Sequence, residues 1–136
     1  EGVIGKTFGN HIIEYQSLLT NHVNTEATNK SGERRTGASD EWNWYTRKAD
    51  LMSEVNVYGT TVWSSSGYDT GIDNRQYAIF QLKPEFINSY GNERFHYWLK
   101  DVASYMDFAF ISYMGTSRGD WNSVNETGVR PRFLIG

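Results

Sequence analysis

The chain of 136 residues contains no cysteine. This absence excludes a disulfide framework, a zinc site built on thiolates and catalysis by a cysteine nucleophile. It leaves the cellular compartment of the protein open.

An excess of positive charge and a long apolar run are also lacking. The formal net charge is −3 and the pI is about 5.6, whereas phosphate binding needs a basic face. Nucleic acid is therefore excluded as the main partner. No apolar run reaches the roughly 20 residues that cross a bilayer, and no signal peptide is visible, so we expect no membrane insertion.

Repeats, low-complexity tracts and linkers are absent as well. The length fits one domain, residues 1–136, which can bury about two-thirds of its unfolded surface. The chain begins at Glu1-Gly2 without methionine. We expect it to be a piece of a longer polypeptide, or a processed or engineered product.

Catalytic and metal-binding motifs are missing too. The histidines His11, His22 and His96 are not paired at a metal-ligand spacing, and a lone histidine is more often structural than a ligand. Neither a nucleophile elbow nor a Gly-rich phosphate loop is present. We therefore predict a protein that is not an enzyme and has no cofactor and no metal. A catalytic site made of His96, a serine and an acid is the third alternative, after a binding role and a structural role.

One oxygen-rich cluster keeps calcium open as an alternative. Asp120, Asn122, Asn125 and Glu126 supply hard oxygen donors within one short segment. Their spacing does not match an EF-hand loop, so a solvated polar loop is the favoured interpretation.

Aromatic residues are abundant, with five Trp, nine Tyr and seven Phe. They exceed the needs of one core, and Tyr and Trp are favoured at recognition surfaces. In the C-terminal third, apolar ends at 97–101 and 128–136 enclose a segment, 105–127, that is aromatic, small or polar and has no lysine. We interpret this segment as a display surface carried by an apolar framework.

Periodicity and turn residues predict the elements. Helical spacing predicts helices over about 10–23 and 50–58, the second ended by Gly59, and Lys83-Pro84-Glu85 predicts a short third helix ended by Gly91. Extended segments are expected at 2–5, 42–46, 60–63, 97–99, 108–113 and 129–135, a surface loop over 24–40, and a tight connection at Gly115 and Gly119. Residues 77–82 fit either a helical turn or a buried strand.

Strand alternation divides the residues after Asp107 into two faces. If Ala109 and Ile111 point inward, then Phe110, Ser112 and Met114 point outward. An outward Phe and Met suit a contact surface better than a solvated face.

Arg118 and Trp121 follow in the same segment and are the residue types most enriched at binding hot spots. The alternative is that Phe110 and Trp121 cover a second layer of the fold. The composition favours neither interpretation over the other.

Several motifs then occur in a recognisable order. They are Asp50-Leu51-Met52-Ser53-Glu54-Val55-Asn56-Val57-Tyr58-Gly59, Gly71-Ile72-Asp73-Asn74-Arg75-Gln76, Tyr97-Trp98-Leu99-Lys100-Asp101-Val102-Ala103-Ser104, Phe108-Ala109-Phe110-Ile111 and Gly128-Val129-Arg130-Pro131-Arg132-Phe133-Leu134-Ile135. This set resembles C-type-lectin-like domains of tailed-phage structural proteins and covers most of the chain from Phe8 onward. Lys100 departs from the family, which carries arginine there.

The resemblance implies an α+β, C-type-lectin-like fold with two main helices flanking small antiparallel sheets and the chain ends close together. Calcium-dependent sugar binding is not implied, because the Trp-Asn-Asp run and the disulfides of true lectins are absent.

The resemblance also implies a location on a virion surface, on a phage head or tail. The partner would be a host-surface protein or glycan. Other virion subunits are further candidate partners, and the chain could form an oligomer through its parent protein. In some relatives retroelements diversify the segment before Gly-Val-Arg-Pro, so this segment is a candidate hypervariable region. The alternative is a capsid decoration or inter-subunit domain without an external ligand. The predicted ligand-binding residues are Tyr105, Asp107, Phe110, Ser112, Met114, Arg118, Asp120, Trp121 and Asn122.

Overall fold

The computed structural model describes residues 6–22, 41–63, 75–103, 107–122 and 127–136. Within these ranges, the side chains of residues 20–22, 41–42 and 120–122 are not described. The predicted strand at 2–5 and the predicted loop at 24–40 lie outside the described residues. No described helix is long and apolar enough to cross a membrane.

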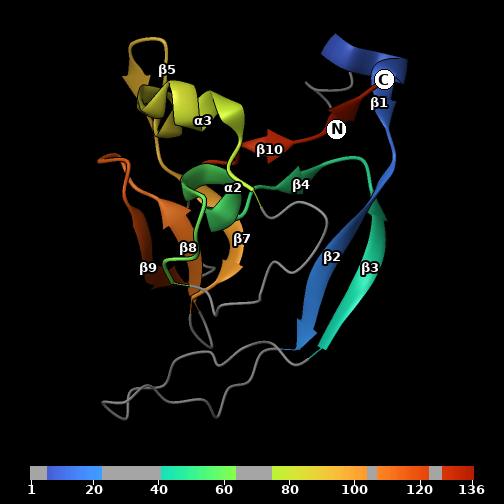
Figure 1. The fold of residues 1–136 in the computed structure, drawn as a ribbon, viewed down its shortest axis with the longest axis horizontal. Helices are drawn as coiled ribbons and strands as arrows, with labels where there is room; N and C mark the ends of the chain where they lie inside the picture. Colours follow the sequence, from blue (N-terminus) through green and yellow to red (C-terminus); the bar gives the residue numbers. More distant parts are fainter. Residues whose placement is uncertain (1–5, 23–40, 64–74, 104–106, 123–126) are drawn as a thin grey trace.

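Short strands make up most of the regular secondary structure of the described chain, and its helices are brief (Figure 1). In chain order the elements are η1 (Gly9–His11), β1 (Ile12–Ile13), β2 (Tyr15–His22), β3 (Glu41–Arg47), β4 (Asp50–Leu51), α2 (Glu54–Tyr58), α3 (Ala78–Leu82), η2 (Pro84–Ile87), β5 (Ser89–Tyr90), β6 (Glu93–Arg94), β7 (Tyr97–Val102), β8 (Asp107–Ile111), β9 (Ser117–Asn122), β10 (Pro131–Arg132) and β11 (Leu134–Ile135).

The predicted fold class, a C-type-lectin-like α+β fold with two main helices, is wrong. Helices α2 and α3 span only five residues each, and η1 and η2 are short 3-10 turns. The described strands form one three-stranded sheet and four two-stranded antiparallel pairs. The described chain is therefore mainly an assembly of small antiparallel sheets.

The helix predicted over 10–23 is wrong as well, because this segment contains β1 and β2. Strand β2 pairs antiparallel with β3, and the Gln16 amide donates to the Thr46 hydroxyl at 2.8 Å. The β-prone partner Trp44 lies opposite Leu18. The apolar residues of β2 suit a helix or a strand equally, and pairing with a distant segment decides between them. The extended piece predicted at 42–46 is confirmed by β3.

Helix α2 confirms the second half of the helix predicted over 50–58. The Ser53 hydroxyl accepts from the Asn56 N–H at 3.1 Å, and the Asn56 side chain accepts from the Ser53 N–H at 3.0 Å. This reciprocal capping box starts the helix, and Gly59 at φ +81° ends it, as predicted. The first half of the predicted helix forms β4 instead, which pairs with β10.

The sheet β7–β8–β9 lies beside α2, and the β2–β3 pair stands apart from it with β4 and β10 between (Figure 1). The strand predicted at 97–99 is confirmed by β7. The strand predicted at 108–113 is confirmed over 108–111 by β8, and residues 112–113 belong to the connection that follows it. The third strand of the sheet is β9, which the sequence analysis assigned to a display loop.

The single strand predicted over 129–135 is wrong. It divides into β10, which pairs with β4, and β11, which pairs with β1. Pro131 begins β10, a position where a residue without an N–H is tolerated. Because β11 pairs with β1, the C-terminal segment lies beside residues near the start of the described chain (Figure 1).

Residues 77–82, for which helix and strand were both open, are helical in α3. Pro84 begins the short turn η2, which is shorter than the predicted helix, since Gly91 at φ +62° lies in the turn between β5 and β6. The predicted extended piece at 60–63 is not a strand.

The main core lies between α2, α3, β7 and β8. Its buried members are Met52, Val57, Phe80, Tyr97, Leu99, Ala109 and Ile111. Burying such side chains contributes about 1.5–3 kcal/mol each. The core is therefore centred on the sheet that carries most of the predicted binding residues.

Tyr97 makes the core sensitive to alkaline pH, which lowers its stability. Its hydroxyl donates to the Ile87 carbonyl at 2.7 Å, and burial raises the pKa of Tyr97 to about 12, although the nearby Arg130 opposes the shift. A raised folded pKa means that this stabilisation is fully present below about pH 10 and is lost as pH rises to about 12.

We expect the free energy of unfolding to fall over that interval by about 2–3 kcal/mol through Tyr97. Denaturant unfolding of the wild type and Tyr97→Phe across this pH range measures the effect. The variant should be less stable at neutral pH, because it lacks the hydrogen bond, and its stability should fall less steeply with pH. Parallel curves for the two proteins would contradict the assignment.

Candidate functional site

Among the described residues of the predicted binding segment, the connection between β8 and β9, residues 112–116, carries the most exposed aromatic and apolar side chains. We call it the hairpin tip. The side chains of Tyr113 and Met114 are 52% and 78% exposed. Within the tip, the Ser112 N–H donates to the Thr116 carbonyl at 3.0 Å, and the Gly115 N–H donates to the Ser112 carbonyl at 2.9 Å. Two prominent side chains thus sit on a closed, hydrogen-bonded turn.

Gly115 allows the chain to make this turn. Its φ is +80°, a left-handed conformation that side chains rarely adopt. A Cβ at this position would also meet the Asn88 side chain at 3.5 Å. The prediction that Gly115 marks a tight connection is confirmed. Gly119 lies inside β9 instead, where a Cβ would come within 2.6 Å of the Ala103 Cβ.

Three other parts of the fold hold the hairpin tip. The Tyr58 hydroxyl of α2 donates to the Gly115 carbonyl at 2.6 Å, and the Asn88 amide donates to the Tyr113 carbonyl. The His96 ring packs against the Tyr113 ring with centroids 4.4 Å apart. Burial raises the pKa of Tyr58, so its hydroxyl stays protonated and continues to donate near neutral pH. The tip is therefore preorganised, which reduces the entropy lost on binding a partner.

The structure brings only part of the predicted site together at this tip. Ser112 and Met114 belong to it. Arg118 is exposed on β9, and Asp107 is half-buried at the start of β8. The backbone of Asp120, Trp121 and Asn122 runs in β9, but their side chains lie outside the description, and so does Tyr105.

Phe110 lies on the face of β8 opposite Ala109 and Ile111, as the alternation predicts, but this face is covered, so the predicted exposure of Phe110 is wrong. Its side chain is 2% exposed and packs edge-on against Trp98, with ring centroids 5.8 Å apart. Trp98 is the cross-strand partner of Phe110, and Tyr97 is the partner of Ile111, so these two pairs lie on opposite faces of the sheet. Ala109 and Ile111 pack in the main core, and Phe110 packs on the other face against Trp98. Phe110 therefore covers a second apolar layer, as the alternative interpretation held.

The described residues contain no group of three or more His, Asp or Glu side chains that could hold a metal ion. The oxygen-rich cluster considered for calcium lies outside the described side chains. His96 is engaged with Tyr113 and does not line the cavity described next.

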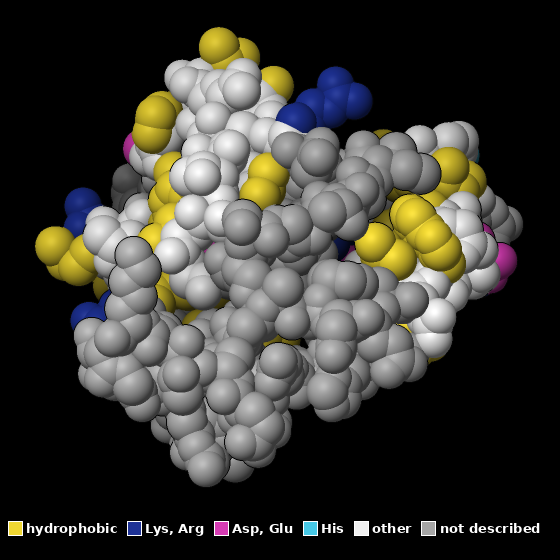
Figure 2. Space-filling view, turned by 60° about the horizontal axis from the view of Figure 1, so that its bottom comes forward, with side chains coloured by type: hydrophobic (Ala, Val, Ile, Leu, Met, Phe, Trp, Pro, Cys, Tyr) yellow, Lys and Arg dark blue, Asp and Glu magenta, His cyan; other side chains and the backbone are white. Residues whose placement is uncertain are grey.

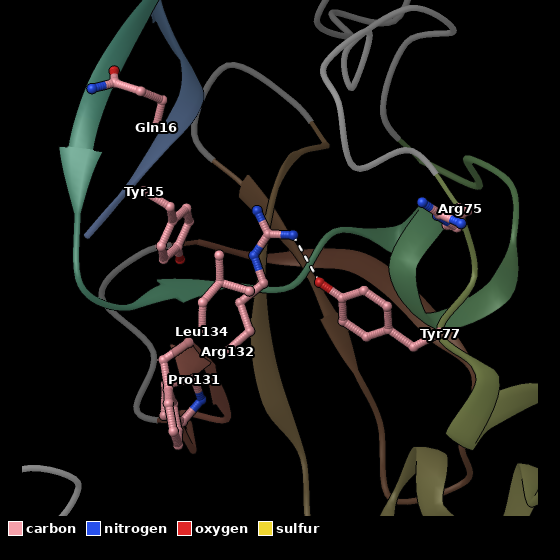
Figure 3. A pocket seen from close by; sticks show the side chains of 8 residues that line it. Tyr15, Gln16, Arg75, Tyr77, Pro131, Arg132 and Leu134 are labelled. Atoms are coloured by element: carbon pink, nitrogen blue, oxygen red, sulfur yellow. Dashed lines mark hydrogen bonds between the residues drawn. The ribbon is translucent and has the colours of Figure 1, made fainter. Parts of the chain in front are cut away.

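A cavity of about 650 Å³ opens between β2, β10 and the segment that leads into α3 (Figure 3). We call it the β2–β10 cavity. Its lining residues are Tyr15, Gln16, Arg75, Tyr77, Pro131, Arg132, Phe133 and Leu134. The sequence does not predict this cavity, because its residues are far apart in the chain and the spacing around Tyr15 and Gln16 predicts a helix. No local signal marks such a site.

Arg132 lies between the two tyrosines of this cavity (Figure 3). Its guanidinium donates to the Tyr77 hydroxyl at 2.8 Å and to the Asn56 side-chain oxygen at 3.1 Å. It also pairs with the Asp50 carboxylate at 3.5 Å. Asp50 in turn accepts from the Ser17 hydroxyl at 2.5 Å. This network joins β2, β4, β10 and α2 behind the cavity.

Comparison of the chain with protein-family models, curated proteins and solved structures finds no match. The functional interpretation therefore depends on the residues and geometry described above and on the resemblance of the sequence motifs.

Proposed function

We propose that the chain is a non-enzymatic binding domain of a phage virion protein, which contacts a host-surface protein or glycan through the hairpin tip. The observation that carries this proposal is the exposure of Tyr113 and Met114 on a turn fixed by Tyr58, Asn88 and His96. An exposed aromatic side chain and an exposed thioether side chain that are neighbours on a fixed turn can act together as a contact point for a partner.

The form of the surface supports a compact contact point. On the face in Figure 2, hydrophobic side chains form separate groups, not one broad patch. A tip with one aromatic and one thioether side chain can enter a pocket on a partner. The Ser112 and Thr116 hydroxyls lie 2.9 Å apart beside them and can add polar contacts.

The virion location is proposed from the motif resemblance alone. Two of those motifs contact each other in the fold. The Trp98 N–H donates to the Gly128 carbonyl at 3.0 Å, and the Gly128 N–H donates to the His96 carbonyl at 3.1 Å. A Cβ at Gly128 would come within 2.6 Å of that carbonyl oxygen. The motif glycine therefore has a physical reason, which is the close approach of two framework segments.

A second candidate function is an inter-subunit or capsid-decoration role without an external ligand. The pair β1–β11 favours it, because Ile13, Leu134 and Ile135 are 44%, 49% and 60% exposed there. A neighbouring virion subunit could cover this apolar ribbon.

The proposal predicts that Met114→Glu weakens binding at least tenfold while the free energy of unfolding changes by no more than about 0.5 kcal/mol. The reason is that Met114 is 78% exposed and contributes little to the core. The measurement is binding of the labelled domain to a panel of bacterial cells and to a glycan array.

Leu82→Glu is the matched control, because Leu82 is 80% exposed on α3, away from the tip. It introduces the same charge on a similarly exposed apolar side chain. Equal binding by the wild type and Met114→Glu, or equal loss in both variants, would refute the tip as the contact surface. No binding by the wild type to any cell or glycan would favour the inter-subunit role.

A further inference from the structure

We propose that the β2–β10 cavity binds an organic carboxylate with a ring-sized body, at a site separate from the hairpin tip. Its volume of about 650 Å³ lies within the range of about 300–1,000 Å³ that small-ligand sites occupy. A space of that size would hold a single sugar or aromatic ring together with its carboxylate.

The charge at the cavity favours an anion. Arg75 and Arg132 line it, and the described lining residues include no carboxylate. The carboxylate of Asp50 lies behind Arg132 and is only 10% exposed. Two arginines and one aspartate leave one positive charge among these described groups. A singly charged carboxylate matches this charge, and the planar guanidinium fork is suited to its geometry.

Arg132 is held in place before any ligand arrives. Its contacts with Tyr77, Asn56 and Asp50 fix the orientation of the guanidinium. Arg75 is exposed on the far side of Tyr77 from Arg132 (Figure 3). Arg132 thus supplies a fixed positive charge inside the cavity, and Arg75 supplies a second guanidinium at its rim.

The remaining lining suits a ring. Tyr15 and Tyr77 provide aromatic faces, and Pro131, Phe133 and Leu134 provide apolar surface. Burial raises the pKa of Tyr15, and the nearby Asp50 adds to that shift, so this hydroxyl stays neutral and does not repel an anion near neutral pH.

The test is an NMR titration of the isotope-labelled protein with four probes. Glucuronate is a carboxylate on a sugar ring and benzoate is a carboxylate on an aromatic ring, while glucose lacks the charge and acetate lacks the ring. We expect saturable shifts of signals from Tyr15, Tyr77 and Leu134 with glucuronate or benzoate, at least tenfold tighter than with glucose or acetate. Whichever of the two ring carboxylates binds more tightly shows whether the cavity accepts a sugar ring or an aromatic ring.

The decisive variant is Arg75→Gln, because Arg75 is exposed and its described contact to the fold is made through its backbone carbonyl. It should weaken ring-carboxylate binding about tenfold. Arg94→Gln makes the same change on the exposed β5–β6 hairpin and should leave binding unchanged. Glucose or acetate binding as tightly as the ring carboxylates, an Arg75→Gln variant with wild-type affinity, or no saturable shift with any probe would each overturn the proposal.

Discussion

Glu54→Gln should reduce the free energy of unfolding by about 3 kcal/mol, although it changes one atom of the side chain. The Glu54 side chain is fully buried. Its carboxylate accepts from the Val62 N–H at 2.9 Å, from the Trp63 N–H at 3.1 Å and from the Ser117 hydroxyl at 2.6 Å. All three groups donate, and together they use both oxygens of the Glu54 carboxylate.

Glutamine would place an NH₂ group where one accepting oxygen stands. With the NH₂ in place of Oε2, the N–H groups of Val62 and Trp63 would both face a donor, and an unsatisfied buried donor costs about 1–3 kcal/mol. With the NH₂ in place of Oε1, the two N–H groups keep their acceptor, but the Ser117 hydroxyl must rotate to accept and the Trp63 N–H loses its second acceptor. The neutral amide avoids the desolvation of a buried charge, which offsets part of the loss. The loss of charge-assisted hydrogen bonds outweighs this gain, because several of them converge on one carboxylate.

Thermal unfolding followed by circular dichroism measures this effect, and we expect the melting temperature to fall by about 10 °C. Glu85→Gln is the matched control, because Glu85 is exposed in η2 and its loss should change stability by less than about 0.5 kcal/mol. If both variants melt with the wild type, the carboxylate of Glu54 does not hold the fold.

Glu54 also explains why 60–63 is not a strand. The segment has β-prone residues, but Val62 and Trp63 turn their N–H groups to the carboxylate of α2. The indole N–H of Trp63 donates to the Ser117 carbonyl at 3.0 Å, so the same segment supports the start of β9. A buried acid on a neighbouring helix overrides local propensity here, and the sequence around 60–63 gives no sign of it.

Features with local causes could be predicted from the sequence. Helix α2 is bounded by Ser53 and Gly59, and both signals lie within the segment itself. The turn at Gly115 was predictable for the same reason, and so was the exposure of Met114, which lies just beyond the end of β8.

Features that depend on distant partners could not be predicted. The apolar residues of β2 fit a helix, and only pairing with β3 makes them a strand. Similarly, β10 and β11 are separated by Phe133 alone but pair with β4 and β1, far away in the chain. The β2–β10 cavity requires all of these pairings, so it could not be found before the fold was known.

Phe110 shows most directly how a distant partner decides whether a residue is buried. Phe110→Ala should lower the free energy of unfolding by about 3–5 kcal/mol. The side chain is 2% exposed and packs against Trp98 in a sheet whose adjacent residues Ala109 and Ile111 are fully buried. Removing the ring deletes its apolar contacts and leaves a cavity between β8 and its covering layer.

The control is Met114→Ala, four residues along the same segment. Met114 is 78% exposed, and its truncation should change stability by less than about 0.5 kcal/mol. Urea unfolding of both variants separates the two roles: Phe110→Ala should shift the midpoint strongly and Met114→Ala should not.

Binding measurements on the folded fraction of each variant distinguish a core residue from a contact residue. Below its own melting temperature Phe110→Ala should bind the partner of the hairpin tip with little change, whereas Met114→Ala should bind it more weakly. The reverse result, with Phe110→Ala stable but unable to bind, would place Phe110 on the contact surface. It would also show that Trp98 does not cover the ring, because a covered ring cannot be removed without destabilising the sheet.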